Sequence, residues 1–339
     1  MKLSIVIPCY NMEKYLPVCL NSLLCQDIDP INYEIIIVND ESQDDTLLIA
    51  KTFAKKHNHI HVIDKKNAGV GAARNTGLNR SQGTYIYFLD PDDYLAKNVL
   101  GKLLTVIDRN HLDILTFKSK EVKDDSNYTS GNINTLSNEI TIMDGISYIA
   151  SNKYQNEVWW YFIRREFLIH TGIKFIEGKW MEDAILTAQL FCVAKKMAHL
   201  NLDAHRYRIL PTSAMRNKSP EHYNKVIYDN ANAAQEFVTL IQNIPQDHKY
   251  SQECVKRLKT RQQSFIFFLL VRLMKSDIST KKIPEMLTKF EEIDAYPLKQ
   301  FLGVDYHGFG YSFMVFIFNN KPLINPFVRI FRTFYTLAK

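Results

Sequence analysis

Three carboxylates follow an apolar run at residues 85–89. Asp90, Asp92 and Asp93 come directly after Tyr-Ile-Tyr-Phe-Leu, a stretch typical of a buried strand. Carboxylates this close in sequence repel one another, so we expect a cation among them. Such oxygen ligands suit Mg²⁺ or Mn²⁺, and these ions in turn suit a diphosphate. Because open α/β sheets bind ligands beyond the carboxyl ends of their strands, the sequence predicts a metal and phosphate site there.

A second polar cluster follows the apolar run at residues 35–38. Asp40 and Ser42 stand between this run and a helical pattern that begins near Leu47. A carboxylate in that place can accept a hydrogen bond from the N–H of a pyrimidine or from a ribose hydroxyl. Taken alone, the residues favour the alternative that Asp40, Ser42 and Asp44 cap the helix and complement its dipole.

A third segment, residues 67–77, brings small residues up to a helical pattern that carries Arg74 and Asn75. Small residues let a backbone approach a ligand closely, and an arginine can hold a phosphate or orient an acid. By itself the Gly69-Val70-Gly71 sequence is more typical of a tight turn. The first strand is not followed by the GxGxxG of a dinucleotide site.

The elements that must position these residues alternate along the first part of the chain. Short apolar runs are separated by helical patterns, which indicates a parallel, mostly buried sheet. The runs are residues 5–7, 35–38, 61–63 and 85–89, and the helical patterns cover residues 16–24 and 47–53. Asn11, and Asp44 or Asp45, are candidate helix N-caps that would place both turns at the same sheet edge as Asp90.

The rest of the chain divides into a polar stretch and two apolar regions. Residues 110–151 are polar and predict a loop or short strands, after which residues 158–163 are apolar and residues 182–193 predict a helix. Beyond residue 219 the pattern is helical, most clearly at 228–240 and 258–273. We therefore expect an α/β domain over 1–218 and a helical region over 219–339.

Composition bounds the class of protein. The chain has 339 residues, 46% hydrophobic and 23% charged, and its net charge of +6 is gathered towards the end, since no Asp or Glu follows Asp305. Five cysteines form no CxxC pair, which favours reduced thiols in a cytosolic protein. The first residues are typical of a strand rather than a signal peptide, and no segment reaches the roughly 18 to 20 apolar residues of a membrane span.

Four blocks together resemble the inverting family 2 glycosyltransferases, which have the GT-A fold. They are residues 4–11, 38–42, 67–77 and 89–93, and they fall in the family's order and spacing. The resemblance implies a Rossmann-like, mostly parallel central sheet flanked by helices, with a nucleotide-binding half at 1–110 and an acceptor-binding half at 111–218. Asn39 and Glu41 depart from the Asp and Gly that the family often has there.

The resemblance also implies roles for particular residues. Pro8 and Tyr10 would lie beside the base of the nucleotide, and Asp40 would bind the uracil or ribose. Arg74 would lie near the base and the metal-binding loop. Asp90 would approach the ribose, and Asp92 would ligate the Mn²⁺ or Mg²⁺ that bridges the donor diphosphate.

The catalytic base is expected at the start of the helix over residues 182–193. Inverting transfer to a hydroxyl needs a carboxylate that faces the acceptor. Glu182-Asp183 resembles the Glu-Asp motif of the family, and Asp183 matches the base. Glu182 would lie on the acceptor side and is the alternative base if the register differs by one. Without the resemblance, both would be favourable first-turn charges.

Two further stretches are expected at the substrate end. Trp159 and Phe162 lie in a region that matches the family's acceptor flank, where an aromatic face can stack on a sugar; the even alternative is that both fill the core. Arg208 and Arg216 resemble a strand and loop that close over the diphosphate, although edge-strand arginines can also be solvated. The lone His205 is more typical of a structural histidine than of a metal ligand.

The end of the chain has a basic amphipathic pattern. Phe327, Ile330, Phe331, Phe334 and Leu337 recur at helical spacing, with basic residues beside them. This pattern suits peripheral contact with an anionic membrane, on the inner face of the cell membrane for a cytoplasmic protein. Packing on the protein's own helices or in a homodimer is the alternative that we favour slightly.

The sequence thus predicts a metal-dependent glycosyltransferase that uses a nucleotide-sugar, most simply a UDP-sugar, and a glycan or polyprenyl-diphosphate-linked acceptor in surface polysaccharide synthesis. The alternatives are a nucleotidyltransferase, although its basic Gly-rich signature is absent, and a catalytically silent glycan-binding or scaffold protein of the same fold. Nucleic-acid binding has little support, because basic residues are scattered among acidic ones until the tail.

Overall fold

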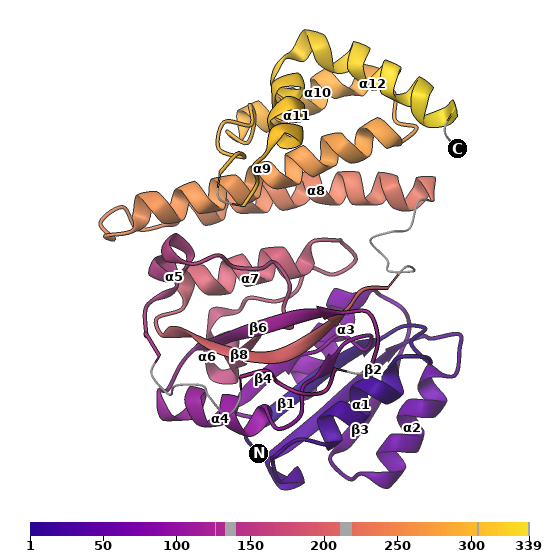
Figure 1. Ribbon diagram of the computed structural model, residues 1–339, viewed down its shortest axis with the longest axis vertical. Coiled ribbons are helices and arrows are strands. Elements are labelled where there is room, and N and C mark those ends of the chain that lie inside the picture. The colour runs from indigo at the N-terminus through magenta and orange to yellow at the C-terminus, as the bar shows by residue number, and fades with distance from the viewer. Residues whose placement is uncertain (126, 133–139, 211–218, 304, 338–339) are drawn as a thin grey trace. The chain divides into compact units, whose positions relative to one another are not determined.

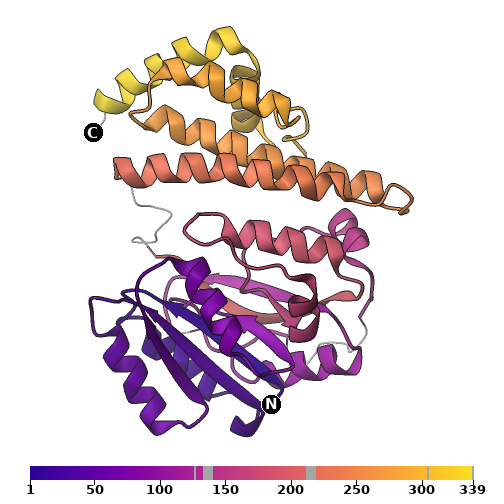
Figure 2. The same ribbon diagram turned by 180° about the vertical axis from the view of Figure 1, so that it is seen from behind.

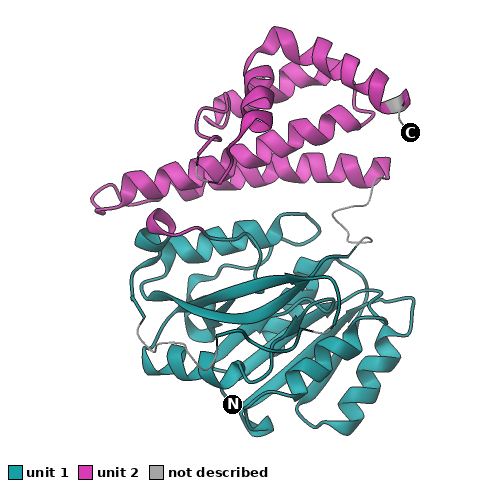
Figure 3. Cartoon of the chain, in the orientation of Figure 1, with its two compact units in different colours: residues 1–148, 154–211 teal, residues 149–153, 212–339 magenta. Residues whose placement is uncertain are grey.

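The chain forms two compact units, shown in different colours in Figure 3. The computed structural model describes residues 1–125, 127–132, 140–210, 219–303 and 305–337. Unit 1 consists of residues 1–148 and 154–211, and unit 2 of residues 149–153 and 212–339. Each unit is described by itself below.

Unit 1 is built on an eight-stranded mixed sheet in the order β3-β2-β1-β4-β7-β6-β8-β5. The strands are β1 (Leu3–Cys9), β2 (Tyr33–Asp40), β3 (Ile60–Lys65), β4 (Tyr85–Phe88), β5 (Tyr94–Leu95), β6 (Ile114–Val122), β7 (Tyr161–Arg164) and β8 (Met197–Arg208). The helices are α1 (Leu16–Leu24), α2 (Thr46–Lys56), α3 (Val70–Arg80), α4 (Leu100–Arg109), α5 (Gly145–Ser151, which runs into unit 2), α6 (Arg165–Thr171) and α7 (Glu182–Val193), with a 3-10 turn at Pro30–Asn32.

The first four strands of the sheet, β3-β2-β1-β4, are parallel, as the alternation of apolar runs and helices predicted. Every residue of β1 and β2 is buried, because helices cover both faces of this part of the sheet (Figures 1 and 2). Helices α1, α2 and α4 contribute to the main core cluster on one face, while α3 packs through Ala73 on the other. The predicted parallel, helix-flanked part of the sheet is confirmed.

The second half of the sheet is mixed. Strand β7 is antiparallel to both β4 and β6, whereas β6 and β8 are parallel, and the short β5 pairs antiparallel with β8. The nine-residue β6 lies inside the polar stretch at 110–151, where its first four residues are buried and most of the later ones are not. The sheet is therefore parallel throughout only in its first half, from β3 to β4.

The turns after β1 and β2 interlock at the carboxyl edge of the sheet. Asn11 has left-handed backbone (φ 54°), and its Oδ1 accepts a hydrogen bond from the Gln43 N–H at 2.8 Å. The prediction of Asn11 as a helix cap is therefore wrong, since α1 begins after Tyr15 without a side-chain cap. At α2, Asp45 occupies the N-cap position, but Asp44 Oδ1 accepts from the Thr46 N–H at 3.0 Å.

The described part of unit 2 consists of helices and the loops that connect them, as the sequence predicted beyond residue 219. Its helices are α8 (Pro220–Gln242), α9 (Ser251–Lys275), α10 (Ile283–Glu292), α11 (Phe309–Asn319) and α12 (Lys321–Leu337), with a 3-10 turn η3 at Thr280–Lys282. An aromatic cluster stabilises the bundle, in which Phe267 stacks on Phe301 at 4.2 Å between ring centroids and Phe237 meets Phe265 edge to face. Within the described parts of the chain, no helix combines the length and the apolar character that crossing a membrane requires.

Candidate active site

The three carboxylates of the acidic loop after β4 differ in their surroundings. Asp90 Oδ1 accepts a hydrogen bond from Arg74 at 2.8 Å. Asp93 is buried; its Oδ1 accepts from the Arg208 backbone N–H at 2.8 Å. Asp92 has no ion-pair partner among the described residues. The three carboxylates therefore differ in their protein partners, and a cation shared among them stays a prediction.

The electrostatics of this loop leave Asp92 as the carboxylate best suited to a metal ion. Burial, with the charges of Asp93 and Asp90, raises the pKa of Asp92 to about 7. A divalent cation would relieve this repulsion. In the part of the chain that the structure describes, no three His, Cys, Asp or Glu side chains are grouped to hold a metal by themselves. Asp92 therefore fits an ion that takes its remaining ligands from phosphate oxygens and water, as Mg²⁺ commonly does.

Arg208, at the end of β8, holds the acidic loop from the protein side. One guanidinium nitrogen donates to the Asp92 carbonyl oxygen at 2.7 Å, and another donates to Asp125. The guanidinium also lies over the rings of Tyr15 and Tyr94, at 5.0 and 5.5 Å from their centroids. Through these contacts Arg208 fixes the position of the acidic loop. Its expected contact with the diphosphate stays a prediction. Arg216, the other expected phosphate ligand, lies outside the described residues.

His205 packs beneath the acidic loop. Its ring is fully buried and stacks on Trp159, with centroids 4.3 Å apart. Nδ1 forms a hydrogen bond with the Ser119 hydroxyl at 2.8 Å. Nε2 lies 3.2 Å from Asp93 Oδ2, but the geometry does not make a hydrogen bond between these two buried atoms. Burial lowers the pKa of His205 to about 3, so its imidazole is neutral.

Arg74, in α3, joins the acidic loop to the start of α7. Its guanidinium donates to Asp90 Oδ1 at 2.8 Å and to Glu182 Oε1 at 2.7 Å, while its face lies over Phe175 at 5.3 Å. Both carboxylates raise the pKa of Arg74 against the opposing effect of burial. Two motifs more than 90 residues apart in sequence therefore meet through one buried cation.

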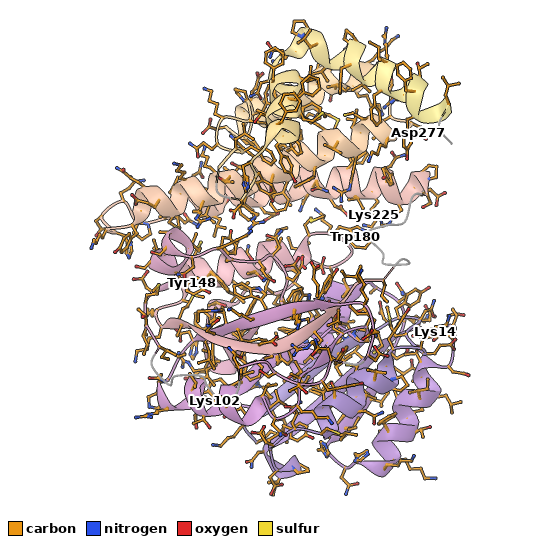
Figure 4. All side chains as sticks on the ribbon, viewed as in Figure 1. Lys14, Lys102, Tyr148, Trp180, Lys225 and Asp277 are labelled. Carbon is orange, nitrogen blue, oxygen red and sulfur yellow. The ribbon has the colours of Figure 1, made fainter. Side chains whose placement is uncertain are left out.

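Glycine is required where α3 approaches the loop before α7. A Cβ at Gly71 would lie 2.6 Å from the carbonyl oxygen of Ile176, closer than any side chain tolerates. Gly69, which precedes α3, has φ 88°, a left-handed conformation that glycine adopts without strain. The Gly69-Val70-Gly71 sequence thus sets the approach of α3 to this loop, whose Trp180 is labelled in Figure 4.

Asp183 is the carboxylate of α7 that is left outside this ion-pair network. It is half-buried, and its Oδ1 accepts the N–H of Ala184 at 2.7 Å. Burial and the charges of Glu157 and Asp90 raise the pKa of Asp183, while Arg74 opposes the shift. Glu182, in contrast, is buried against Arg74, and burial raises its pKa as well. Both residues lie in the first turn, but of the two only Glu182 has an ion-pair partner among the described residues.

Asp40 does not cap α2, the alternative that the residues alone favoured. The carboxylate is buried, accepts a hydrogen bond from Lys65 Nζ at 2.7 Å, and accepts the N–H groups of Ala68 and Gly69 at 3.1 and 2.9 Å. It therefore holds the turn before α3. Its expected contact with a base or ribose stays a prediction, for which a remaining oxygen lone pair would have to serve.

Glu41, which stands where the family often has glycine, has left-handed backbone with φ 64°. Its Oε2 accepts the N–H of Asn67 at 3.2 Å, and its carbonyl oxygen accepts from Gln43 at 2.8 Å. The loop therefore keeps a backbone conformation typical of glycine, and these hydrogen bonds offset the cost of a side chain there.

The residues expected beside the nucleotide base differ in exposure. Tyr10, directly after β1, is 47% exposed and can offer a ring face to a base. Pro8 is buried within β1, where it pairs with Val38 of β2. The place of Pro8 beside a base therefore stays a prediction, and Tyr10 is the side chain of the two that a ligand can reach.

The aromatic residues expected at the acceptor end lie mostly inside the unit. Phe162 is a fully buried member of the main core cluster, as the alternative to acceptor binding held. Trp159 is buried as well, and its ring stacks with those of His205 and the 37% exposed Tyr207. Tyr207 was not singled out from the sequence, although the alternation of burial along β8 turns it outward.

The Arg74 bridge leads to a stability prediction. Replacing Arg74 with methionine leaves Glu182 buried without its cation, so we expect the free energy of unfolding to fall by about 3 to 5 kcal/mol. All three tryptophans lie in unit 1, so urea unfolding followed by tryptophan fluorescence reports on this unit. The exposed Arg109 of α4 provides the control: its replacement with methionine should change the energy by about 0.5 kcal/mol or less. Equal effects of the two substitutions would contradict the bridge.

Comparisons with solved structures agree with the architecture and define the class as GT-A. The crystal structure of S. aureus TarS 1-349 in complex with UDP superimposes with a TM-score of 0.69 at 21% identity, over 100% of this chain and 92% of that one. A mannosyltransferase from Pyrobaculum calidifontis, in complex with GDP-Man and Mn²⁺, matches with a TM-score of 0.54 at 14% identity, over 94% of this chain and 86% of that one. At these identities the likeness establishes the fold alone.

Sequence comparison gives the family. The model of "Glycosyl transferase family 2" matches residues 4–175, just over half of the chain, which therefore belongs to glycosyltransferase family 2. The glycosyltransferase EpsJ of Bacillus subtilis is 32% identical over 214 residues, 62% of each chain. A poly(ribitol-phosphate) beta-N-acetylglucosaminyltransferase, TarS of Staphylococcus aureus, is 37% identical over 123 residues, which are 36% of this chain and 22% of that protein. The chain thus spans about three fifths of EpsJ and less of TarS.

Proposed function

We propose that the protein transfers a sugar from a UDP-sugar to a hydroxyl group of a surface-glycan acceptor, with a divalent metal ion and inversion at the anomeric carbon. One observation carries this proposal: Arg74 connects the acidic loop of Asp90 to the first turn of α7, where Asp183 lies. A diphosphate held at the loop would therefore present its sugar towards that turn.

The residues of the chain divide the work of such a transfer. Asp183 accepts the proton of the acceptor hydroxyl while the hydroxyl oxygen bonds to the anomeric carbon and the bond from that carbon to the diphosphate oxygen breaks. Asp92 would hold Mn²⁺ or Mg²⁺ together with the diphosphate, and the bound ion would supply charge neutralisation for the leaving group. No covalent intermediate is needed, so the product has inverted configuration.

UDP is the proposed nucleotide because of the relatives. The fragment TarS 1-349 has been crystallised with UDP and with UDP-GlcNAc. The structural match to this fragment covers 100% of this chain. The more distant mannosyltransferase was crystallised with GDP-Man, so GDP is the natural comparison. Tyr10 and Asp40 are the proposed contacts to the base and ribose.

The acceptor is proposed from the same relatives. TarS and a poly(ribitol-phosphate) beta-glucosyltransferase of Bacillus spizizenii, 39% identical over 124 residues, are named for a polyol-phosphate polymer. A polymer of this kind, a glycan or a polyprenyl-diphosphate-linked oligosaccharide all present the hydroxyl that Asp183 would deprotonate. Tyr207, exposed beside Trp159, is the side chain that we propose for stacking on the acceptor.

Calorimetric titration with UDP, and with GDP as the control nucleotide, each with and without Mn²⁺, tests the donor. We expect UDP to bind in the presence of Mn²⁺ and GDP to bind much more weakly. Binding of GDP instead would overturn the donor class. If neither nucleotide bound, the reading as a silent glycan-binding or scaffold protein would gain support over the enzyme.

A further inference from the structure

Unit 2 exposes phenylalanine side chains, whereas the phenylalanines of unit 1 in the described ranges are buried or half-buried. Every strongly exposed phenylalanine among the described residues belongs to α11 or α12: Phe309, Phe313, Phe316 and Phe334. Phe309 is 87% exposed and Phe334 is 68% exposed. Single exposed apolar residues are normal on a protein surface, but a group of phenylalanines on two adjacent helices marks an interaction surface.

These side chains form one face rather than a scatter. Phe309, Phe313 and Phe316 repeat at the spacing of one helix side, and Ile330, Phe334 and Leu337 do the same on α12. Phe313 meets Phe327 of α12, with centroids 6.0 Å apart, so the two helices share the surface. We call the surface formed by six of these residues the α11–α12 apolar face: Phe309, Phe313, Phe316, Ile330, Phe334 and Leu337. Figure 4 shows side chains projecting outward from the ribbon of α12.

The opposite sides of the two helices are already used by the bundle. Val315 and Phe318 of α11 and Ile324 and Val328 of α12 are buried. Arg332 fixes α12 on α9, because its guanidinium donates to the carbonyl oxygens of Leu273 and Ile278 at 2.8 Å each. The apolar face is therefore held outward by a packed bundle and is not an unfilled part of the core.

The charged side chains carried by α11 and α12 themselves are all basic. No Asp or Glu occurs after Asp305, whereas Lys321, Arg329, Arg332 and Lys339 do. Lys321 pairs with Glu291 and Arg332 with backbone carbonyl oxygens, while Arg329 is exposed beside Ile330. Aromatic residues bordered by cations, with no carboxylate on either helix, are complementary to an anionic lipid surface. A two-fold contact between copies would instead oppose this basic surface to itself.

We propose that the α11–α12 apolar face inserts into the headgroup region of an anionic membrane, with Arg329 at the phosphate level. The partner is identified by its chemistry: an acyl boundary that accepts phenylalanine rings and a negative surface that accepts the basic border. This inference concerns unit 2 alone and does not depend on the proposed transfer reaction.

Sedimentation of the full chain with vesicles tests the proposal without any nucleotide. We expect binding to phosphatidylcholine vesicles that contain one third phosphatidylglycerol, and weaker binding to phosphatidylcholine alone. The double substitution Phe309→Ser with Phe334→Ser should lower the partition coefficient about tenfold or more. Arg329→Glu should lower it about tenfold on anionic vesicles only.

Matched controls come from exposed residues of unit 1. Ile31→Ser with Leu48→Ser removes two exposed aliphatic side chains, and Arg109→Glu reverses an exposed charge; neither should change vesicle binding. The proposal is overturned if the wild-type chain does not sediment with anionic vesicles, or if control and face variants lose binding equally. It is also overturned if light scattering shows a dimer that Phe309→Ser with Phe334→Ser dissociates, since the face would then serve a second copy.

Discussion

Replacing Asp183 with asparagine is expected to lower kcat for sugar transfer by about 10² to 10⁴-fold, the range that general-base catalysis supplies. Affinity for UDP and Mn²⁺ should persist, because the acidic loop keeps its partners. Asparagine can still accept the Ala184 N–H that Asp183 accepts at 2.7 Å, so α7 should begin in the same way. What the variant loses is the second oxygen that would take the acceptor proton.

The measurement is initial rates with a UDP-sugar, combined with calorimetry of UDP on the same preparation. Glu166→Gln is the control, since it also removes a first-turn carboxylate, from the exposed side of α6. Near-normal turnover of the Asp183 variant would refute the base assignment. If Glu182→Gln were the inactive variant instead, the base would be one position earlier; its burial against Arg74 argues against that outcome.

The fold was predictable because its signals are local. Apolar runs at 5–7 and 35–38 lie within the parallel strands β1 and β2, the run at 85–89 covers β4 and one residue beyond it, and the pattern over 182–193 matches α7. What the sequence left open is the antiparallel half of the sheet. The pairing of β7 with β4 and β6 depends on contacts between segments that are far apart in the sequence. The pattern of apolar residues within one segment does not indicate which distant strand it pairs with.

The site residues were found by motif, but their partners were not. Arg74 and Glu182 are 108 residues apart, and Arg208 lies 116 residues from the Asp92 carbonyl oxygen that it holds. Spacing in sequence carries no information about such pairs. For the same reason the residues alone favoured capping for Asp40, whereas the carboxylate serves a turn that begins 28 residues later.

Asn11 after β1 and Ser42 after β2 show that the preference of such residues for helix caps can be overridden. Asn11 has the residue type of a helix cap, yet its side chain bonds Gln43 across the sheet edge. Ser42 likewise accepts the Asn11 N–H at 3.1 Å and does not cap α2. Two turns that meet at one edge satisfy each other's backbone groups, and this exchange competes with capping.

Replacing Asp92 with asparagine is expected to abolish the Mn²⁺-dependent part of UDP binding, because the carboxylate proposed to hold the ion is lost. The wild-type protein should also show a pH dependence. The folded-state pKa of Asp92 is raised to about 7, so below this pH a proton occupies the carboxyl and competes with the cation. Affinity for UDP with Mn²⁺ should therefore be full above pH 7 and about tenfold weaker one pH unit below it.

The asparagine variant separates this effect from the titration of the nucleotide, whose terminal phosphate also takes up a proton near pH 6, as phosphate monoesters do at about that pH. Calorimetry of both proteins from pH 6 to pH 8, with Mn²⁺ and without it, gives the share that belongs to Asp92. Asp125→Asn is the matched control, since it removes a different carboxylate, the one that pairs with Arg208, while leaving the candidate ligand in place. If the Asp92 variant kept the Mn²⁺ dependence of the wild-type protein, Asp90 would have to be the ligand, and its bond to Arg74 would have to open when the metal binds.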